Sequence, residues 1–264
     1  MSAVTLAPAG RSNVVTNTLQ IARRNLLHIK ATPEQLVEMS IQPLMFLVLF
    51  VYVFGGAIAG SAAEYLQFAL PGILVQGVAF LPFTTALALN VDFQRGVIDR
   101  FRSLPIARSA VIGGRILADG VRILWSILII TGFSMLLGFR FGGGTAGAFG
   151  GLALVTAFGL VMCWPMAFIG ITARTTESVN TWGFMIILPL TFASSAFVDP
   201  DTMPGWLQGF VELNPVTWVI DAARGLMLGP PYPVARPLTG AIIWLIVITA
   251  VFAPLAILRY RRRV

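Results

Sequence analysis

Long stretches without charged residues dominate the hydrophobic pattern of this chain. Six of them are about as long as the roughly 20 apolar residues that a membrane-spanning helix needs. They cover residues 39–63, 65–91, 123–139, 148–173, 178–198 and 237–258. The pattern therefore predicts an all-α integral membrane protein with six transmembrane helices.

The placement of positive charge sets the expected topology. If the N-terminus is cytoplasmic, the inner segments hold most of the arginines, whereas the outer segments hold only Arg140, Arg224 and Arg236. Cytoplasmic loops of membrane proteins collect Lys and Arg in this way. Six spans with both termini in the cytoplasm, in a bacterial inner (plasma) membrane, is the expected arrangement.

Composition supports the membrane assignment. The chain has 264 residues, of which 57% are hydrophobic and 11% charged, whereas soluble domains carry about 25% charged residues. The net charge of +7 follows from the arginine-rich inner loops, so a nucleic-acid partner is not expected.

The region before the first span, residues 1–36, is predicted to be a cytoplasmic segment with an amphipathic helix. Apolar residues recur there at helical spacing, and Arg23 and Arg24 lie off that stripe. A basic amphipathic helix suits the lipid headgroup layer. Thr32 and Pro33 then indicate the start of a second helix that leads into the first span. The alternative is a solvated tail helix.

The segment 92–105 follows the second span and carries a distinctive charge pattern. On a helix Asp92, Arg95, Asp99 and Arg102 share one face, apolar residues form another, and Leu104-Pro105 ends the helix. A short charged helix with an apolar back is suited to docking a soluble partner. The alternative is a loop that only fixes topology.

The segment 203–229 is too polar to span and too apolar for a free loop. Two short helices are expected, one starting near Trp206 and one capped by Asn214 with Pro215 at its first position. Asp221 and Arg224 lie one turn apart and could pair. The prediction is a re-entrant helical hairpin in the outer leaflet before the last helix, either a resting element or a gate.

The residues needed for several kinds of chemistry are missing. No phosphate-binding loop is present, and His28 and Cys163 are the only histidine and cysteine. Asp119 and Arg122 come nearest to membrane depth, and we expect them to pair. No catalytic site, metal site or bound cofactor is therefore predicted in this chain, and ion-coupled transport is disfavoured.

Several motifs resemble the ABC-2 type permeases, notably the daunorubicin-resistance-type exporter family. They are Phe54-Gly55, Gln94-Arg95-Gly96 through Ser103-Leu104-Pro105, Gly114-Arg115-Ile116-Leu117-Ala118-Asp119, Met203-Pro204-Gly205-Trp206-Leu207, Asn214-Pro215-Val216 and Ala223-Arg224-Gly225-Leu226. They cover nearly the whole chain in the family's order. The family often has a glutamate where this chain has Gln94.

The resemblance implies a transmembrane domain over residues 37–264 and a role for each motif. Residues 92–105 would be the coupling helix, and the residues expected to contact a separate ATPase subunit are Asp92, Gln94, Arg95, Asp99, Arg100, Arg102, Leu104 and Pro105. ATP and magnesium would bind in that subunit. A second permease copy or a homologue would complete the assembly.

The function expected from these observations is ATP-driven export of an amphiphilic or lipid-like cargo, such as a drug, a glycolipid or a polyketide lipid. Three alternatives remain: export of a polysaccharide or teichoic-acid-type glycan, which an aromatic-lined path would favour, a lipid-modifying membrane enzyme, and an assembly subunit.

Overall fold

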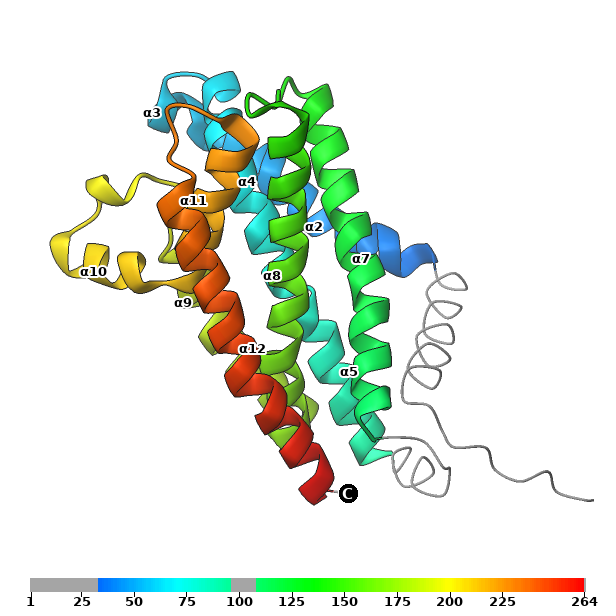
Figure 1. Cartoon of the computed structure of the whole chain (residues 1–264). Coiled ribbons are helices and arrows are strands. Elements are labelled where there is room, and N and C mark those ends of the chain that lie inside the picture. Colours follow the sequence, from blue (N-terminus) through cyan, green and yellow to red (C-terminus); the bar gives the residue numbers. More distant parts are fainter. Residues whose placement is uncertain (1–32, 96–107, 264) are drawn as a thin grey trace, which may run out of the picture.

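The structure is a computed structural model that describes residues 33–95 and 108–263. Every regular element in those two ranges is helical. The long helices form one bundle, with the C-terminus at one end of it (Figure 1). We call this the C-terminal end of the bundle and the opposite one the far end.

The first rod of the bundle consists of three helical pieces in direct succession. These are α2 (Pro33–Leu49), the π-helix η1 (Phe50–Phe54) and α3 (Gly55–Ala59). The start at Pro33 confirms the predicted helix start. Gly60 ends the rod with φ of +75°, a conformation that glycine adopts at little cost. The predicted uninterrupted helix over 39–63 is therefore broken by a π-turn and a tight corner.

The second rod contains α4 (Ala62–Phe80) and α5 (Pro82–Gln94). The Ser61 hydroxyl caps α4 by accepting a hydrogen bond from the Glu64 amide at 3.2 Å. The two helices meet at Leu81 and Pro82, because proline has no N–H to continue the ladder. α5 extends three residues beyond the predicted end of the span at residue 91. Asp92 to Gln94 therefore belong to α5 rather than to a separate helix.

The next two helices are the longest in the centre of the chain. α7 (Arg108–Leu136) begins well before the predicted span at 123, and α8 (Gly144–Thr172) begins close to the predicted position. The turn between them meets the end of another helix, because the amides of Gly142 and Gly143 both donate to the Met227 carbonyl at 3.0 Å. This contact joins two helix ends at the far end of the bundle.

α9 (Thr176–Phe192) runs back from the C-terminal end of the bundle. It ends six residues before the predicted limit at 198, and residues 193–199 form a non-helical connector. The connector packs against α4, where a Cβ added to Gly72 would lie 2.7 Å from the Ala196 Cα. Gly72 is ten residues, or about 15 Å, along α4. The chain therefore leaves α9 well inside the bundle.

Three helices follow the connector: the 3-10 turn η2 (Pro200–Thr202), α10 (Gly205–Leu213) and α11 (Pro215–Leu228). α10 projects from the side of the bundle, and α11 leads to the far end (Figure 1). The predicted starts at Pro204-Gly205 and Asn214-Pro215 are confirmed. α12 (Ala235–Arg263) then returns to the C-terminal end.

Five helical segments in the described residues are long and apolar enough to cross a membrane. They are Ser40–Ala59, Ala62–Gln94, Ile116–Leu136, Gly144–Thr172 and Ala235–Arg262. α9, with 17 residues, is not among them. The structure thus gives an all-helical chain with five candidate spans, and a sixth crossing stays a prediction.

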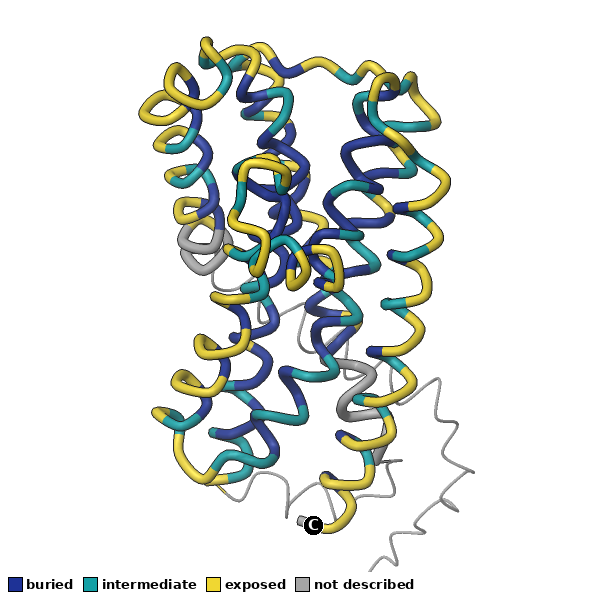
Figure 2. The backbone as a smooth tube through the Cα atoms, turned by 90° about the vertical axis from the view of Figure 1, so that its left-hand side faces the viewer, coloured by how far each residue is buried: buried dark blue, intermediate teal, exposed yellow. Residues whose placement is uncertain are grey.

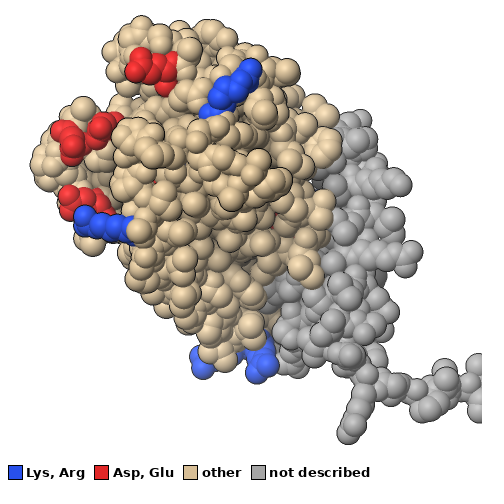
Figure 3. Space-filling model, turned by 45° about the horizontal axis from the view of Figure 1, so that its top comes forward, with Lys and Arg blue, Asp and Glu red and all other residues tan. Residues whose placement is uncertain are grey.

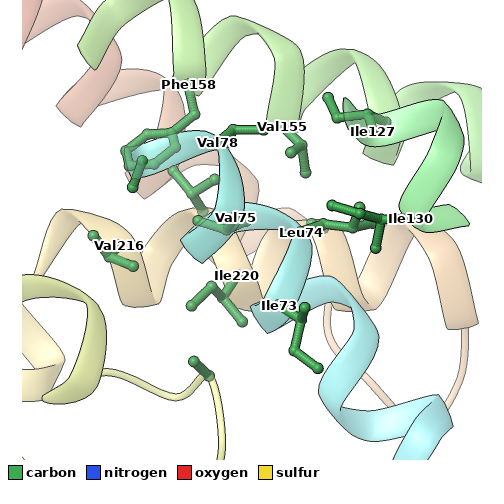
Figure 4. Close-up of a cluster of buried hydrophobic side chains, with 14 of the residues drawn as sticks. Ile73, Leu74, Val75, Val78, Ile127, Ile130, Val155, Phe158, Val216 and Ile220 are labelled. Atoms are coloured by element: carbon green, nitrogen blue, oxygen red, sulfur yellow. The ribbon is translucent and has the colours of Figure 1, made fainter. Parts of the chain in front are cut away.

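The core of the bundle lies around α4, most of whose residues are buried, while the outer helices are exposed on one side (Figure 2). Ile73, Leu74 and Val78 of α4 meet side chains of α7 and α8, including Ile127 and Phe158 (Figure 4). On the bundle surface, large apolar side chains of α2, α9 and α12 are exposed. A continuous apolar surface of this kind needs lipid or another protein to cover it.

Charged side chains are scarce on the view of the molecule in Figure 3. Acidic groups lie toward the far end and the side of the bundle, with basic groups beside them, and further basic groups lie at the C-terminal end, where Arg259, Arg261 and Arg262 belong to α12.

Candidate functional site

A groove lined by phenylalanine side chains opens between α2, the α4–α5 junction and α9. Its volume is about 460 Å³, which is in the range of small-molecule pockets. Five rings line it: Phe46, Phe80, Phe83, Phe184 and Phe192. We call it the phenylalanine groove. It was not expected from the sequence, because its walls come from three separate segments.

The rings of the groove pack against one another across the α5–α9 contact. The centroids of Phe83 and Phe184 are 4.8 Å apart, and those of Phe80 and Phe184 are 6.2 Å apart. Gly183 lets α9 approach closely here, since an added Cβ would overlap the ring of Phe83. The groove is therefore bounded by the start of α5 on one side and by α9 on the other.

A small set of amide side chains supplies the polar groups of the groove. Gln42, Gln76 and Asn180 all line it. Gln76 is only 4% exposed, and its amide has no side-chain hydrogen bond within the described ranges. An amide in the wall of a groove offers a ligand both a hydrogen-bond donor and an acceptor. The groove thus suits a flat apolar molecule with few polar atoms.

At the C-terminal end of the bundle, the predicted contact residues Asp92 and Gln94 lie in the last turn of α5, and Arg95 follows as its C-cap. The Gln94 amide donates to the side-chain oxygen of Asn90 at 2.8 Å and to the Arg174 carbonyl at 3.3 Å. The side chain of Gln94 is therefore engaged with its own chain. Asn90 was missed by the sequence analysis, although an Asn in an apolar helix is itself a signal.

The remaining predicted contact and interfacial residues lie outside the described residues. They are Asp99, Arg100, Arg102, Leu104 and Pro105 in the segment after α5, and Arg23 and Arg24 near the N-terminus. Their roles stay predictions.

Asp119 of α7 forms a buried polar cluster between α5 and α7. It pairs with Arg122 at 3.0 Å, which confirms the expected pair. The Thr85 hydroxyl of α5 donates to the second carboxylate oxygen, a partner that the sequence analysis missed. Since Thr85 lies on the next helix, this contact ties α5 to α7 just below the groove.

Arg224 of α11 joins three parts of the chain in the far half of the bundle. Its Nη1 donates to Asp221 at 2.9 Å, its Nη2 to the Ser195 carbonyl at 2.7 Å and its Nε to the Phe68 carbonyl at 3.2 Å. Its guanidinium also lies 4.0 Å from the centroid of the Phe68 ring. The predicted pair with Asp221 is confirmed, and Arg224 in addition holds the connector against α4.

Asn214 serves two helix ends at once. Its side-chain oxygen accepts from the Val216 amide at 2.9 Å, which confirms the predicted N-cap of α11. Its amide group donates to the carbonyls of Leu190 and Ala193, both at 2.7 Å. These carbonyls belong to the end of α9, where a helix leaves acceptors unpaired. Asn214 therefore explains why α9 can stop inside the bundle.

α10 presents three of its large apolar side chains outward, while Val211 is buried. Trp206 is 80% exposed, and Phe210 and Leu213 are also exposed. This exposure suits contact with lipid, since Trp is enriched at membrane interfaces.

Comparison with known proteins agrees with this picture. The ABC-2 type transporter family matches residues 16–228. The chain is 38% identical to the daunorubicin resistance ABC transporter permease protein DrrB1 of Streptomyces coeruleorubidus, over 96% of this chain and 89% of the relative.

Two further relatives are more distant. A probable doxorubicin resistance ABC transporter permease protein, DrrC, of Mycobacterium tuberculosis is 29% identical over 83% of this chain and 79% of its own length. The inner membrane transport permease YadH of Escherichia coli is 23% identical over 73% of this chain and 77% of its own length. The apolar bundle and these matches together establish that the chain belongs to the ABC-2 type transporter permeases, as a multi-pass membrane subunit without an ATPase site of its own.

Proposed function

We propose that this permease exports an amphiphilic or lipid-like cargo, such as a drug, a glycolipid or a polyketide lipid, from the cytoplasm or the inner leaflet. The phenylalanine groove carries this proposal. Its rings offer apolar contact, and the amide of Gln76 offers one hydrogen bond. The aromatic drugs named for the relatives DrrB1 and DrrC have this balance and are suitable probes.

The proposed assembly contains two permease copies, or this chain and a homologue, with two ATPase subunits. Residues 92–105 dock on the ATPase subunit, which binds ATP and magnesium. Residues near Arg23 and Arg24 form an interfacial helix on membrane lipids. α9 with the connector after it forms the remaining crossing, and α10 and α11 are the re-entrant element in the outer leaflet. Both termini are then cytoplasmic, which a C-terminal reporter active only in the cytoplasm would test.

The cargo test uses the permease reconstituted with its ATPase subunit in liposomes. Phe184→Ala removes a ring from the middle of the groove, and Gln76→Leu removes the amide while keeping the volume. Loss of one hydrogen bond or one ring contact of about 1.4 kcal/mol changes affinity about tenfold. We therefore expect the KM for an anthracycline to rise by roughly that factor in each variant.

The matched control is Phe149→Ala. Phe149 is 75% exposed and does not line the groove, so its loss should leave the KM unchanged. If Phe184→Ala and Gln76→Leu behave like this control, the groove is not the cargo path.

A second candidate, export of a glycan, is favoured by the aromatic lining of the groove. Against it, all five rings belong to phenylalanine, which has no polar atom for sugar hydroxyls. This candidate would be established instead if Phe184→Ala reduced the release of a labelled polyprenyl-linked glycan and left anthracycline export unchanged.

A further inference from the structure

The last turns of α5 are fastened to the end of α8 by the side-chain amide of Asn90. Asn90 is 1% exposed, and its Nδ2 donates to the carbonyls of Gly170 and Ala173 at 3.0 and 2.9 Å. These acceptors lie at the C-terminus of α8, where helix carbonyls lack partners of their own. A residue of one membrane helix thus caps the end of another.

Gln94 extends this link by one turn. Because it donates to the Asn90 side-chain oxygen, it fixes which way the Asn90 amide points, with the donor group toward α8. Its second contact, to the Arg174 carbonyl, lies beyond the end of α8, in the turn that leads to α9. Both contacts need a donor at position 94, which the glutamate common in the family could not supply when ionised.

The packing around this amide pair leaves no room for the helices to slide. Gly170 of α8 lies against Ala86 of α5 so closely that a Cβ on Gly170 would overlap the Ala86 carbonyl oxygen. Such backbone contact between helices is stiff, because close-packed atoms tolerate little displacement. α5 and the end of α8 therefore behave as one body.

The turn after α8 is short and leads directly into α9. The Thr175 hydroxyl caps α9 by accepting from the Ser178 amide at 3.1 Å. Only two residues, Ala173 and Arg174, separate this cap from the end of α8. α9 then carries Asn180 and Phe184 into the groove. A displacement of the end of α5 therefore moves the start of α9, the helix that forms one wall of the groove.

We propose that Asn90 and Gln94 are positioning residues that transmit movement of segment 92–105 through the α8–α9 turn to α9, and so to the phenylalanine groove. This inference rests on the proposed docking of that segment on an ATPase subunit. The junction at Leu81 and Pro82 serves as the flexible end of the unit, because the helix ladder is interrupted there and both residues adjoin groove-lining Phe80 and Phe83.

The test compares three substitutions at Gln94, which is exposed and therefore tolerant. Gln94→Met keeps the shape but has no donor, Gln94→Glu replaces the donor by an acceptor, and Gln94→Lys keeps a donor. In the reconstituted complex, we expect cargo moved per ATP to fall about tenfold in Gln94→Met and Gln94→Glu, the equivalent of one lost hydrogen bond. Gln94→Lys should stay near the wild-type ratio.

A second measurement separates this inference from the proposed function. Spin labels at Val91→Cys in α5 and Thr181→Cys in α9 report the distance between the two helices in the permease alone. The distance distribution should be narrow with Gln94 or Gln94→Lys and broad with Gln94→Met, whether or not an ATPase subunit binds. Failure of the proposed docking would show as loss of the complex without this change.

Two outcomes would overturn the inference. One is an unchanged distance distribution and an unchanged transport ratio in Gln94→Met. The other is loss of ATPase binding in Gln94→Met with the α5–α9 distance unaltered, since Gln94 would then be a direct contact of the ATPase subunit.

Discussion

Replacing Arg224 by methionine should strongly destabilise the far half of the bundle. Methionine approximates the volume of the arginine stem but cannot serve the three acceptors, which are the Asp221 carboxylate and the carbonyls of Ser195 and Phe68. Of its hydrogen bonds to α4 and α11, the connector would then keep only the one from the Tyr65 hydroxyl of α4 to the Phe197 carbonyl and the one from the Ser195 hydroxyl to Asp221 of α11.

The magnitude follows from the burial of the two charges. The Arg224 side chain is 5% exposed and that of Asp221 is 36% exposed, so only the arginine is deeply desolvated. Removing one partner of a buried pair costs roughly 3–5 kcal/mol, and the exposure of Asp221 places the expected loss near the lower limit, because solvent screens its charge. At about 2–4 °C per kcal/mol for a protein of this size, Tm should fall by roughly 6–12 °C.

The assay is thermal unfolding in lipid nanodiscs, followed by the fluorescence of the tryptophans. Arg224→Lys is the informative companion, because it keeps the charge but cannot reach three acceptors, and it should lose about half as much. Adding Asp221→Asn to Arg224→Met should recover part of the loss by removing the unpaired charge. A Tm drop below about 2 °C for Arg224→Met would refute the assignment of Arg224 as the main attachment of the connector.

Three further predictions concern single contacts. Asn214→Ala removes the caps of both α9 and α11 and should lower the free energy of unfolding by about 2 kcal/mol, which is measured as a lower Tm. If only one of the two caps contributed, the loss of free energy would be about half as large. Gly72→Val would drive a side chain into the backbone of Ala196, and it should abolish accumulation of folded protein in membranes, measured by size-exclusion chromatography. Asp119→Leu leaves Arg122 without its carboxylate and should lower Tm by about 5 °C or more, while Asp119→Asn should do so by less.

The sequence predicted the parts of this fold that depend on local pattern. Charge-free stretches gave the helices, and the caps at Asn214-Pro215 and the pair of Asp221 with Arg224 follow from residues at most four positions apart. Such contacts repeat at helical spacing, so a pattern analysis can find them.

Contacts between distant segments were out of reach for the same reason. The Asn90 amide meets the Gly170 carbonyl across 80 positions, and Thr85 meets Asp119 across 34. The early end of α9 was also unpredictable, because its last carbonyls are capped from α11 by Asn214. Apolar residues continue past Phe192, so composition alone extends the helix to the wrong residue.

Side-chain hydrogen bonds to other helices are found near the two ends of the α4–α5 rod and not in its middle. In the described residues, side-chain hydrogen bonds from other helices reach this rod at Phe68 and again at Thr85 and Asn90. None of the described bonds joins residues 69–84 to another helix, a length of about 24 Å. This zone of the rod is held to its neighbours by packing alone.

The phenylalanine groove lies in this apolar middle zone, between two levels that are held by polar contacts. The amide of Gln76 lines the groove, and the hydroxyls of Ser126 and Thr131 on the neighbouring α7 have no hydrogen-bond partner among the described residues. A helix that is fastened at the Asn90 level and at the Arg224 level can still separate from α9 in between. A path that opens at the groove therefore requires fewer hydrogen bonds to break than one that opens at either end, and this is where the proposed cargo would pass.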